Sequence, residues 1–168
     1  DVMVPPGADP AFCAGLDLKA LGRDGGPLRA PAAAGDPVTG RRGPMPPHTK
    51  PVIGAVNGAA VTGGFEIALN CDFLVASERA RFADTHARVG IQPGWGLSVL
   101  LPQAIGVRRA RQMSTTGNFV DAATALAWGL VNEVVPHDEL LPRALALAAD
   151  IVSHDQAAGR PLLQTYAE

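Results

Sequence analysis

The sequence predicts an α/β fold built around a largely parallel sheet. Strand-like and helix-like segments alternate along the chain, and the strand-like segments are continuously apolar, as in parallel strands that are covered on both faces. The chain has 168 residues, of which 47% are hydrophobic and 18% are charged. A chain of this size can bury a substantial core, so we expect residues 1–168 to form a single domain.

Four segments carry the strand signal. They are residues 1–5 (DVMVP), 50–58 (KPVIGAVNG), 72–78 (DFLVASE) and 130–135 (LVNEVV). The second is a continuous apolar run that ends in an Asn-Gly turn. Residues 6–15 (PGADPAFCAG) predict a turn-rich loop, and residues 80–96 predict a loop with a short strand at its start.

Four segments predict helices from their periodicity and their capping residues. They lie at residues 63–70, 97–117, 121–129 and 137–154. Asp121 and Gly129 suit the cap and the stop of the third helix. We expect Pro102 and Gly106 to interrupt the second helix, and Pro142 to lie in the first turns of the fourth.

Charge and cysteine usage exclude several classes of function. The formal net charge is −2, so there is no bulk electrostatic basis for binding nucleic acid or an anionic membrane. No uncharged apolar stretch reaches about 18 residues, the length that suggests a membrane-spanning helix. Cys13 and Cys71 lie far apart, and the cysteines and histidines lack metal-ligand spacing. We therefore expect reduced thiols, no metal site and a cytoplasmic location.

Residues 22–47 stand apart in composition. They are rich in Gly, Pro, Ala and Arg and show little periodicity, so we expect a flexible loop. The chain also begins at Asp1 inside a strand-like segment. We therefore expect the natural protein to have further N-terminal residues.

The stretch AAVTGGFE, residues 59–66, opens a helix with two adjacent glycines instead of a good capping residue. A helix N-terminus exposes N–H groups and the positive end of the dipole, and glycine lets an external oxygen approach them. Glu66 lies about one turn along the helix from Gly63. Two interpretations stay open: Gly63 and Gly64 serve a negatively polarised oxygen, or they only allow the helix to pack closely on a strand.

Three segments resemble the enoyl-CoA hydratase/isomerase family, the crotonases. They are residues 11–18 (AFCAGLDL), 50–72 (KPVIGAVNGAAVTGGFEIALNCD) and 80–96 (ARFADTHARVGIQPGWG). Their order, spacing and strand–helix context match the family from about Asp1 to beyond Pro136. The resemblance implies a crotonase-like fold, with repeated ββα units and a sheet flanked by helices.

The resemblance also implies where a substrate binds. In crotonases, two backbone N–H groups form an oxyanion hole for the carbonyl of a coenzyme A thioester, and Leu16 and Gly63 occupy the matching positions. Ala14, Leu16, Asp17 and Leu18 match the stretch that contacts the adenine and pantetheine of coenzyme A. The thioester is the substrate, and no separate cofactor is implied.

Two further positions adjoin the implied thioester site. Gly64 follows the second oxyanion donor, and we expect it to contact the substrate. Trp95, in the segment QPGWG, either lines the acyl pocket or has a packing role, and both interpretations stay open.

The catalytic acids match the family at one position and depart from it at another. Enoyl-CoA hydratases use two glutamates to position water, and the first matches Glu66. His86 occupies the second position, so the two-carboxylate arrangement is absent from the sequence. Histidine donates and accepts protons near neutral pH, so His86 is either a catalytic group or only a polar residue of the pocket. We expect the nearby Asp84 to be solvated rather than to orient His86.

Two classes of function stay open. One is an enzyme on enoyl-CoA thioesters in which Glu66 transfers protons, and the other is a non-catalytic acyl-CoA-binding protein that has lost the second glutamate. A neutral imidazole offers water only one acceptor, so the sequence favours an isomerase or a slow hydratase over a fast hydratase. Family members form trimers or hexamers, in which a C-terminal helical part completes the neighbouring site. We expect a homotrimer or hexamer, and we expect most of that helical part to be missing here.

Overall fold

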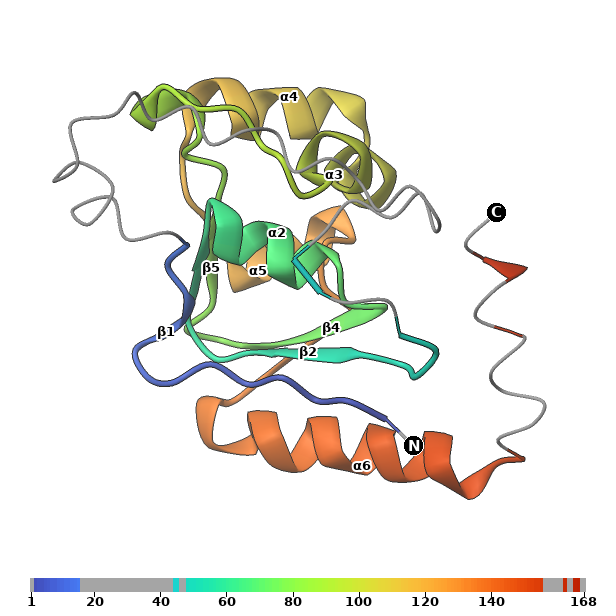
Figure 1. Ribbon diagram of the computed structural model, residues 1–168. Coiled ribbons are helices and arrows are strands. Elements are labelled where there is room, and N and C mark those ends of the chain that lie inside the picture. Colours follow the sequence, from blue (N-terminus) through green and yellow to red (C-terminus); the bar gives the residue numbers. More distant parts are fainter. Residues whose placement is uncertain (1, 16–43, 46–47, 156–161, 163–164, 167–168) are drawn as a thin grey trace, which may run out of the picture.

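The computed structural model of the chain describes residues 2–15, 44–45, 48–155, 162 and 165–166. Three predicted binding residues, Leu16, Asp17 and Leu18, lie outside the described residues, as does the predicted loop 22–47 except for residues 44–45. Strands and helices alternate within the described ranges, so the predicted α/β class is confirmed (Figure 1).

The strands divide between two sheets. A three-stranded parallel sheet has the order β2 (Ile53–Val56), β4 (Phe73–Ser77) and β7 (Glu133–Val135). A four-stranded sheet has the order β1 (Ala11–Cys13), β3 (Ala59–Val61), β5 (Arg81–Ala83) and β6 (Val120–Asp121). Among these described strands, only β5 and β6 pair in the antiparallel direction, so the predicted parallel character is confirmed.

The sequence does not predict β1 and β3. The first lies inside a segment predicted as a loop, and the second lies in a stretch predicted to lead straight into a helix. Each has three residues, which is too short for a strand pattern to show. The segment predicted as the first strand instead makes isolated parallel bridges beside β2, from Met3 to Val52 and from Pro6 to Ala55.

The chain repeats a strand–strand–helix unit, as the resemblance implies. β2, β3 and α2 (Gly63–Leu69) form one unit, and β4, β5 and α3 (Leu97–Ile105) form the next. Equivalent strands pair with each other, β2 with β4 in one sheet and β3 with β5 in the other. The carboxyl ends of β3 and β5 therefore meet at one edge, and β1 joins them there through its parallel pairing with β3.

Helices cover both faces of the three-stranded sheet (Figure 1). On one face, α6 (Leu140–Ser153) packs through Leu140 and Ala144 against Ile53 of β2 and Val75 of β4. On the other face lie α2 and α5 (Ala122–Trp128), with α3 and α4 (Val107–Thr116) beyond them. Short 3₁₀ helices at Ala87–Val89 and His137–Glu139 precede α3 and α6, respectively.

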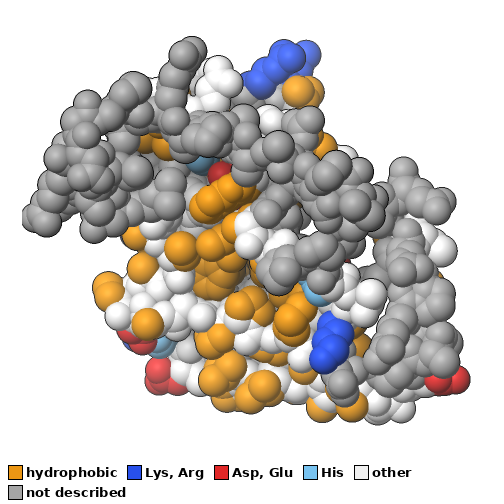
Figure 2. All heavy atoms as spheres, viewed as in Figure 1, with side chains coloured by type: hydrophobic (Ala, Val, Ile, Leu, Met, Phe, Trp, Pro, Cys, Tyr) orange, Lys and Arg blue, Asp and Glu red, His pale blue; other side chains and the backbone are white. Residues whose placement is uncertain are grey.

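The larger core lies between the two sheets and the helices α2, α3, α4 and α5. The rings of Phe65 and Phe82 meet there with their centroids 5.7 Å apart. Hydrophobic side chains are also visible at the surface, over the middle and lower part of the face in Figure 2. None of the helices in the described ranges is both long and apolar enough to cross a bilayer.

Two glycines end helices where the sequence predicts it. Asp121 caps α5 by accepting a hydrogen bond from the N–H of Thr124 at 2.8 Å, and Gly129 ends that helix. Gly106 separates α3 from α4. The capping chemistry of these segments is therefore local, and the sequence predicts it correctly.

The prediction that Pro102 interrupts a helix is wrong. Pro102 lies inside α3, which continues to Ile105. Leu97, Leu101 and Ile105 are buried on one face of this helix. The packing of that face offsets the backbone hydrogen bond that a proline cannot donate.

The helix α2 begins in close contact with the backbone of β1, and Gly64 makes this contact possible. A Cβ atom at Gly64 would overlap the carbonyl oxygen of Cys13. At Gly63, the corresponding atom would lie 2.9 Å from Cζ3 of Trp95. The first obstacle is rigid backbone, whereas the second is a side chain that can shift. The close-packing interpretation therefore holds for Gly64.

Alanine at these two glycines is expected to have unequal effects on stability. Gly64→Ala should lower the free energy of unfolding by about 3 kcal/mol, because the new methyl group forces α2 away from β1. Gly63→Ala is the matched control in the same turn and should cost about 1 kcal/mol, because the Trp95 ring can move. Urea denaturation measures both values, and similar losses in the two variants would contradict this account.

Candidate active site

Three segments that follow parallel strands meet at one edge of the four-stranded sheet. Gly15 follows β1, Gly63 follows β3, and His86 follows β5. The register places Val61 opposite Ala83, so β3 and β5 end at the same level. Ligand sites commonly form outside the carboxyl ends of parallel strands, and this edge is therefore the candidate site.

Gly15 and Gly63 lie side by side at the start of α2. A Cβ atom on Gly15 would lie 3.2 Å from the nitrogen of Gly63, and Gly15 has a φ of 84°, which favours glycine. Gly63 is the first residue of α2, a position whose N–H finds no acceptor within its own helix. Gly15 directly precedes Leu16, so the two segments implied as oxyanion donors come together here, although Leu16 itself lies outside the described residues.

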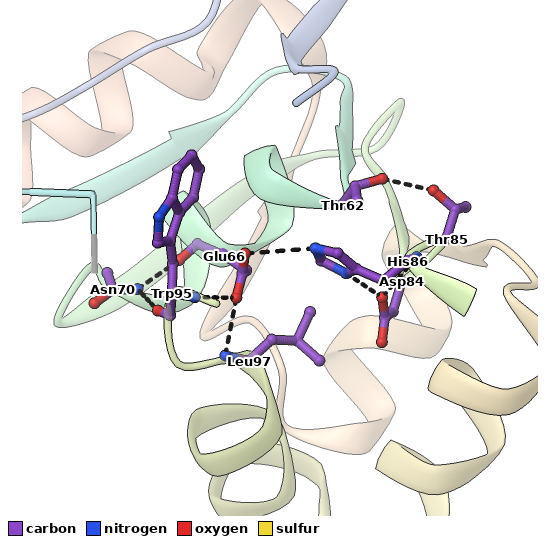
Figure 3. Close-up of polar contacts among 8 residues, drawn as sticks. All are labelled: Thr62, Glu66, Asn70, Asp84, Thr85, His86, Trp95 and Leu97. Atoms are coloured by element: carbon purple, nitrogen blue, oxygen red, sulfur yellow. Dashed lines mark hydrogen bonds and ion pairs between the residues drawn. The ribbon is translucent and has the colours of Figure 1, made fainter. Parts of the chain in front are cut away.

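Thr62 connects the start of α2 to the segment that carries His86. It has a φ of 54° and a ψ of −117°, which is a strained backbone conformation for a β-branched residue. Its N–H donates to the carbonyl of Ala83 at 3.0 Å, and its hydroxyl oxygen lies 2.5 Å from that of Thr85 (Figure 3). Contacts with the β5 end thus hold the peptide that carries the Gly63 N–H.

Glu66 is buried, and the backbone that leads into α3 holds its carboxylate. Oε1 accepts hydrogen bonds from the N–H groups of Trp95 at 2.7 Å and Leu97 at 3.3 Å. Asn70, at the end of α2, secures the same segment by donating to the carbonyl of Trp95 at 3.0 Å. These contacts leave Oε2 facing His86 (Figure 3).

His86 lies between two acidic side chains. Its Nε2 is 3.5 Å from Glu66 Oε2, and its Nδ1 is 2.6 Å from Asp84 Oδ1. Asp84 is only 1% exposed, so the expectation that it is solvated is wrong. Its Oδ1 also accepts the backbone N–H of His86 at 3.2 Å, because an aspartate readily bonds to the backbone two residues on.

The protonation of His86 depends on these neighbours. Burial opposes the charged ring, but the hydrogen bonds and charges of Asp84 and Glu66 outweigh it and raise the pKa of His86 to about 9. Burial likewise favours the neutral form of Asp84, but hydrogen bonds from His86 and Ser114 outweigh it and lower the pKa of Asp84. At neutral pH, His86 is therefore an imidazolium with one N–H directed at Asp84 and the other at Glu66.

The other predicted residues in the described ranges border this region. Trp95 is half-buried, and its ring edge lies against Gly63. Ala14 is exposed and precedes Gly15 at the end of β1. Gly64 is buried against Cys13, and packing explains its identity.

Several residues that support the site escape sequence reasoning. Thr62, Thr85 and Asn70 act through contacts between segments that lie 23 or 25 residues apart in the chain. No local pattern marks such contacts. Asp84 is different, because the spacing Asp-x-His is a recognisable signal for a side chain that folds back onto the backbone.

The arrangement combines three chemical abilities. The Glu66 carboxylate can accept a proton, the His86 imidazolium can donate one, and the N-terminus of α2 can bind a developing oxyanion. The two proton-transfer atoms, Oε2 and Nε2, are 3.5 Å apart. The site thus places a proton acceptor beside a proton donor, close to the start of α2.

The titration of His86 tests this geometry. We expect ¹⁵N NMR to give a pKa of about 9, with the resonances assigned through their loss in His86→Gln. This value lies above the ordinary value of about 6.5. The protonated ring therefore stabilises the fold fully below about pH 6.5, and this contribution is lost as the pH rises through the folded pKa. A neutral His86 ring at pH 7 would contradict the prediction.

Known proteins resemble the chain over almost its whole length. The sequence model of the enoyl-CoA hydratase/isomerase family matches residues 1–167. The chain is 44% identical over 156 residues to a probable peroxisomal enoyl-CoA hydratase of Arabidopsis thaliana, which covers 92% of this chain and 57% of that protein. It is 37% identical over 150 residues to a probable mitochondrial enoyl-CoA hydratase of Dictyostelium discoideum, which covers 89% of this chain and 53% of that protein.

A solved structure extends the comparison to three dimensions. The crystal structure of an enoyl-CoA hydratase from Mycobacterium avium superposes with a TM-score of 0.86 at 57% sequence identity, covering 99% of this chain and 67% of that chain. The chain spans little more than half the length of the two relatives from Arabidopsis thaliana and Dictyostelium discoideum. Both the family match and the shared fold lead to one conclusion: this chain belongs to the enoyl-CoA hydratase/isomerase family.

Proposed function

We propose that the protein hydrates enoyl-CoA thioesters to 3-hydroxyacyl-CoA thioesters, with Glu66 as the base. The observation that carries this proposal is the pair of Glu66 Oε2 and His86 Nε2, 3.5 Å apart and one turn from the N-terminus of α2. Relatives named enoyl-CoA hydratase support the substrate class.

In this proposal the backbone binds the thioester. The N–H groups of Gly63 and Leu16 hold the thioester oxygen, and Ala14, Asp17 and Leu18 contact coenzyme A. Trp95 lines the acyl site, as the contact between its ring and Gly63 suggests, and the predicted part of Gly64 is reduced to packing that positions Gly63. The coenzyme A thioester is then the substrate, and the chemistry uses no separate cofactor.

The chemical step divides between two side chains. Glu66 Oε2 takes a proton from water while the water oxygen bonds to the β-carbon, and the electron pair of the double bond moves to the thioester carbonyl. The N–H groups of the oxyanion hole stabilise the resulting enolate. The Nε2–H of His86 then protonates the α-carbon. The proton on Glu66 finally passes to His86 across their 3.5 Å separation, which restores both groups.

Protonation of His86 favours hydration, whereas the sequence alone favours isomerisation or slow hydration. A neutral imidazole offers one acceptor to water, but an imidazolium has no acceptor and can only donate. Hydration needs a base for water and an acid for the α-carbon, and this pair offers both. Isomerisation through Glu66 alone and acyl-CoA binding without chemistry are the alternative outcomes of the experiments below.

We also propose a homotrimer or hexamer, on the family resemblance, and a cytoplasmic location, on the cysteine usage. Cys13 and Cys71 are free thiols in the structure. The two curated relatives are named as peroxisomal and mitochondrial proteins, so the compartment differs among family members.

Replacing the base should separate chemistry from binding. We expect Glu66→Gln to reduce hydration of crotonyl-CoA by about 1,000-fold, while acyl-CoA binding stays within about threefold. Mass spectrometry follows the thioester products, and calorimetry measures binding. Glu133→Gln, which alters a surface carboxylate bound to Arg143, is the control and should keep activity. Full activity of Glu66→Gln on every thioester would refute the mechanism, and binding without turnover by the parent would favour the binding protein.

The oxyanion donor is tested by two substitutions that add similar bulk. Gly63→Pro removes the N–H, whereas Gly63→Ala keeps it and places a Cβ atom against the Trp95 ring in the same way. We expect kcat of the proline variant to fall about 100- to 1,000-fold below that of the alanine variant. Equal kcat values for two folded variants would show that this N–H does not bind the substrate oxygen.

A further inference from the structure

Asp84 is buried at the candidate site, and its carboxylate contacts His86 and the helix α4. Its Oδ1 contacts both Nδ1 and the backbone N–H of His86, at 2.6 and 3.2 Å. Ser114 of α4 adds a hydrogen bond to the same carboxylate. A buried carboxylate is costly unless it is paired, and the partner here is a ring that also faces Glu66.

The groups around the His86 ring determine which of its two ring protons is available to a substrate. Among the described residues, the charged groups that face His86 are Asp84 from its own loop and Glu66 from α2. Ser114, from α4, is uncharged. Arg88 lies nearby in sequence, but its guanidinium donates to the carbonyl of Thr116 and to Asn118. The Nδ1 proton is thus committed to Asp84, and the Nε2 proton is the one directed at Glu66 and the reacting atoms.

We propose that Asp84 is a positioning residue of the reaction: it holds Nδ1–H of His86, so that the ring keeps a proton on Nε2 and aims it at the α-carbon. This inference rests on the proposed function for its catalytic part. Its structural part, a charged and oriented ring, exists in the free protein and is measured separately.

A purely structural role for Asp84 makes a different prediction. The bond from Oδ1 to the backbone N–H of His86 by itself would only shape the turn before Ala87–Val89. Asp84→Asn retains the size and an acceptor oxygen for that bond, but removes the negative charge. A structural role therefore survives this substitution, whereas His86 loses one of the two carboxylates that raise its pKa.

The experiment compares the parent, Asp84→Asn and a control, Asp121→Asn, which alters a capping aspartate outside the site. The first measurement is the ¹⁵N titration of the His86 ring in the full chain without ligand. We expect the pKa of His86 to fall by more than about one unit in Asp84→Asn and to stay unchanged in the control.

The second measurement is the pH profile of crotonyl-CoA hydration. We expect kcat at pH 7.5 to fall about 10- to 100-fold in Asp84→Asn with little change in KM, and the loss to grow as the pH rises.

The outcomes distinguish this inference from the proposed function. An unchanged His86 titration in Asp84→Asn overturns the inference, whatever the activity. If the titration shifts but the parent turns over no thioester, the proposed function fails and the positioning of His86 stands. If Asp84→Asn does not fold, the ¹⁵N spectrum of the parent protein provides the test. A His86 ring that does not carry protons on both nitrogens at pH 7.5 overturns the inference.

Discussion

The close approach of α2 to β1 is the contact on which the site depends. Gly64 has no side chain, so the backbone of the first turn of α2 lies against the carbonyl of Cys13. That contact sets the N–H of Gly63 beside Gly15, and it fixes where Glu66 emerges one turn later. The two adjacent glycines thus have different tasks. Gly64 allows the packing, and Gly63 presents a backbone donor next to the segment that leads to Leu16.

Parallel pairing of β1, β3 and β5 extends this local contact into a site. Because the strands run in one direction, the segments that follow them leave the sheet at the same edge. The antiparallel strand β6 lies on the far side of β5, away from this junction. The strained Thr62 and its contact with Thr85 show that the edge is held tightly, since unfavourable backbone persists only where its surroundings impose it.

The buried chain from Asp84 through His86 to Glu66 is an electrostatic unit. Removing one member of such a buried unit leaves the others without compensation, a change that typically costs about 3–5 kcal/mol. Backbone donors at Trp95 and Leu97 complete the bonding of Glu66 and connect it to α3. The same contacts therefore orient the His86 ring and satisfy its burial.

The sequence alone determines the α/β class, the cap at Asp121, the break at Gly106 and the family. The cap and the break follow from local residue chemistry, and the family follows from the order and spacing of the matching segments. It also singles out Glu66, His86 and Gly63. Only the tertiary structure shows β1 and β3, the role of Gly64, and the burial of Asp84. These features depend on partners distant in the chain: a three-residue strand exists because its neighbour pairs with it, and a carboxylate is buried because α4 and His86 surround it. The charge of His86 also depends on the tertiary structure, because its pKa is set by the groups that folding brings around the ring.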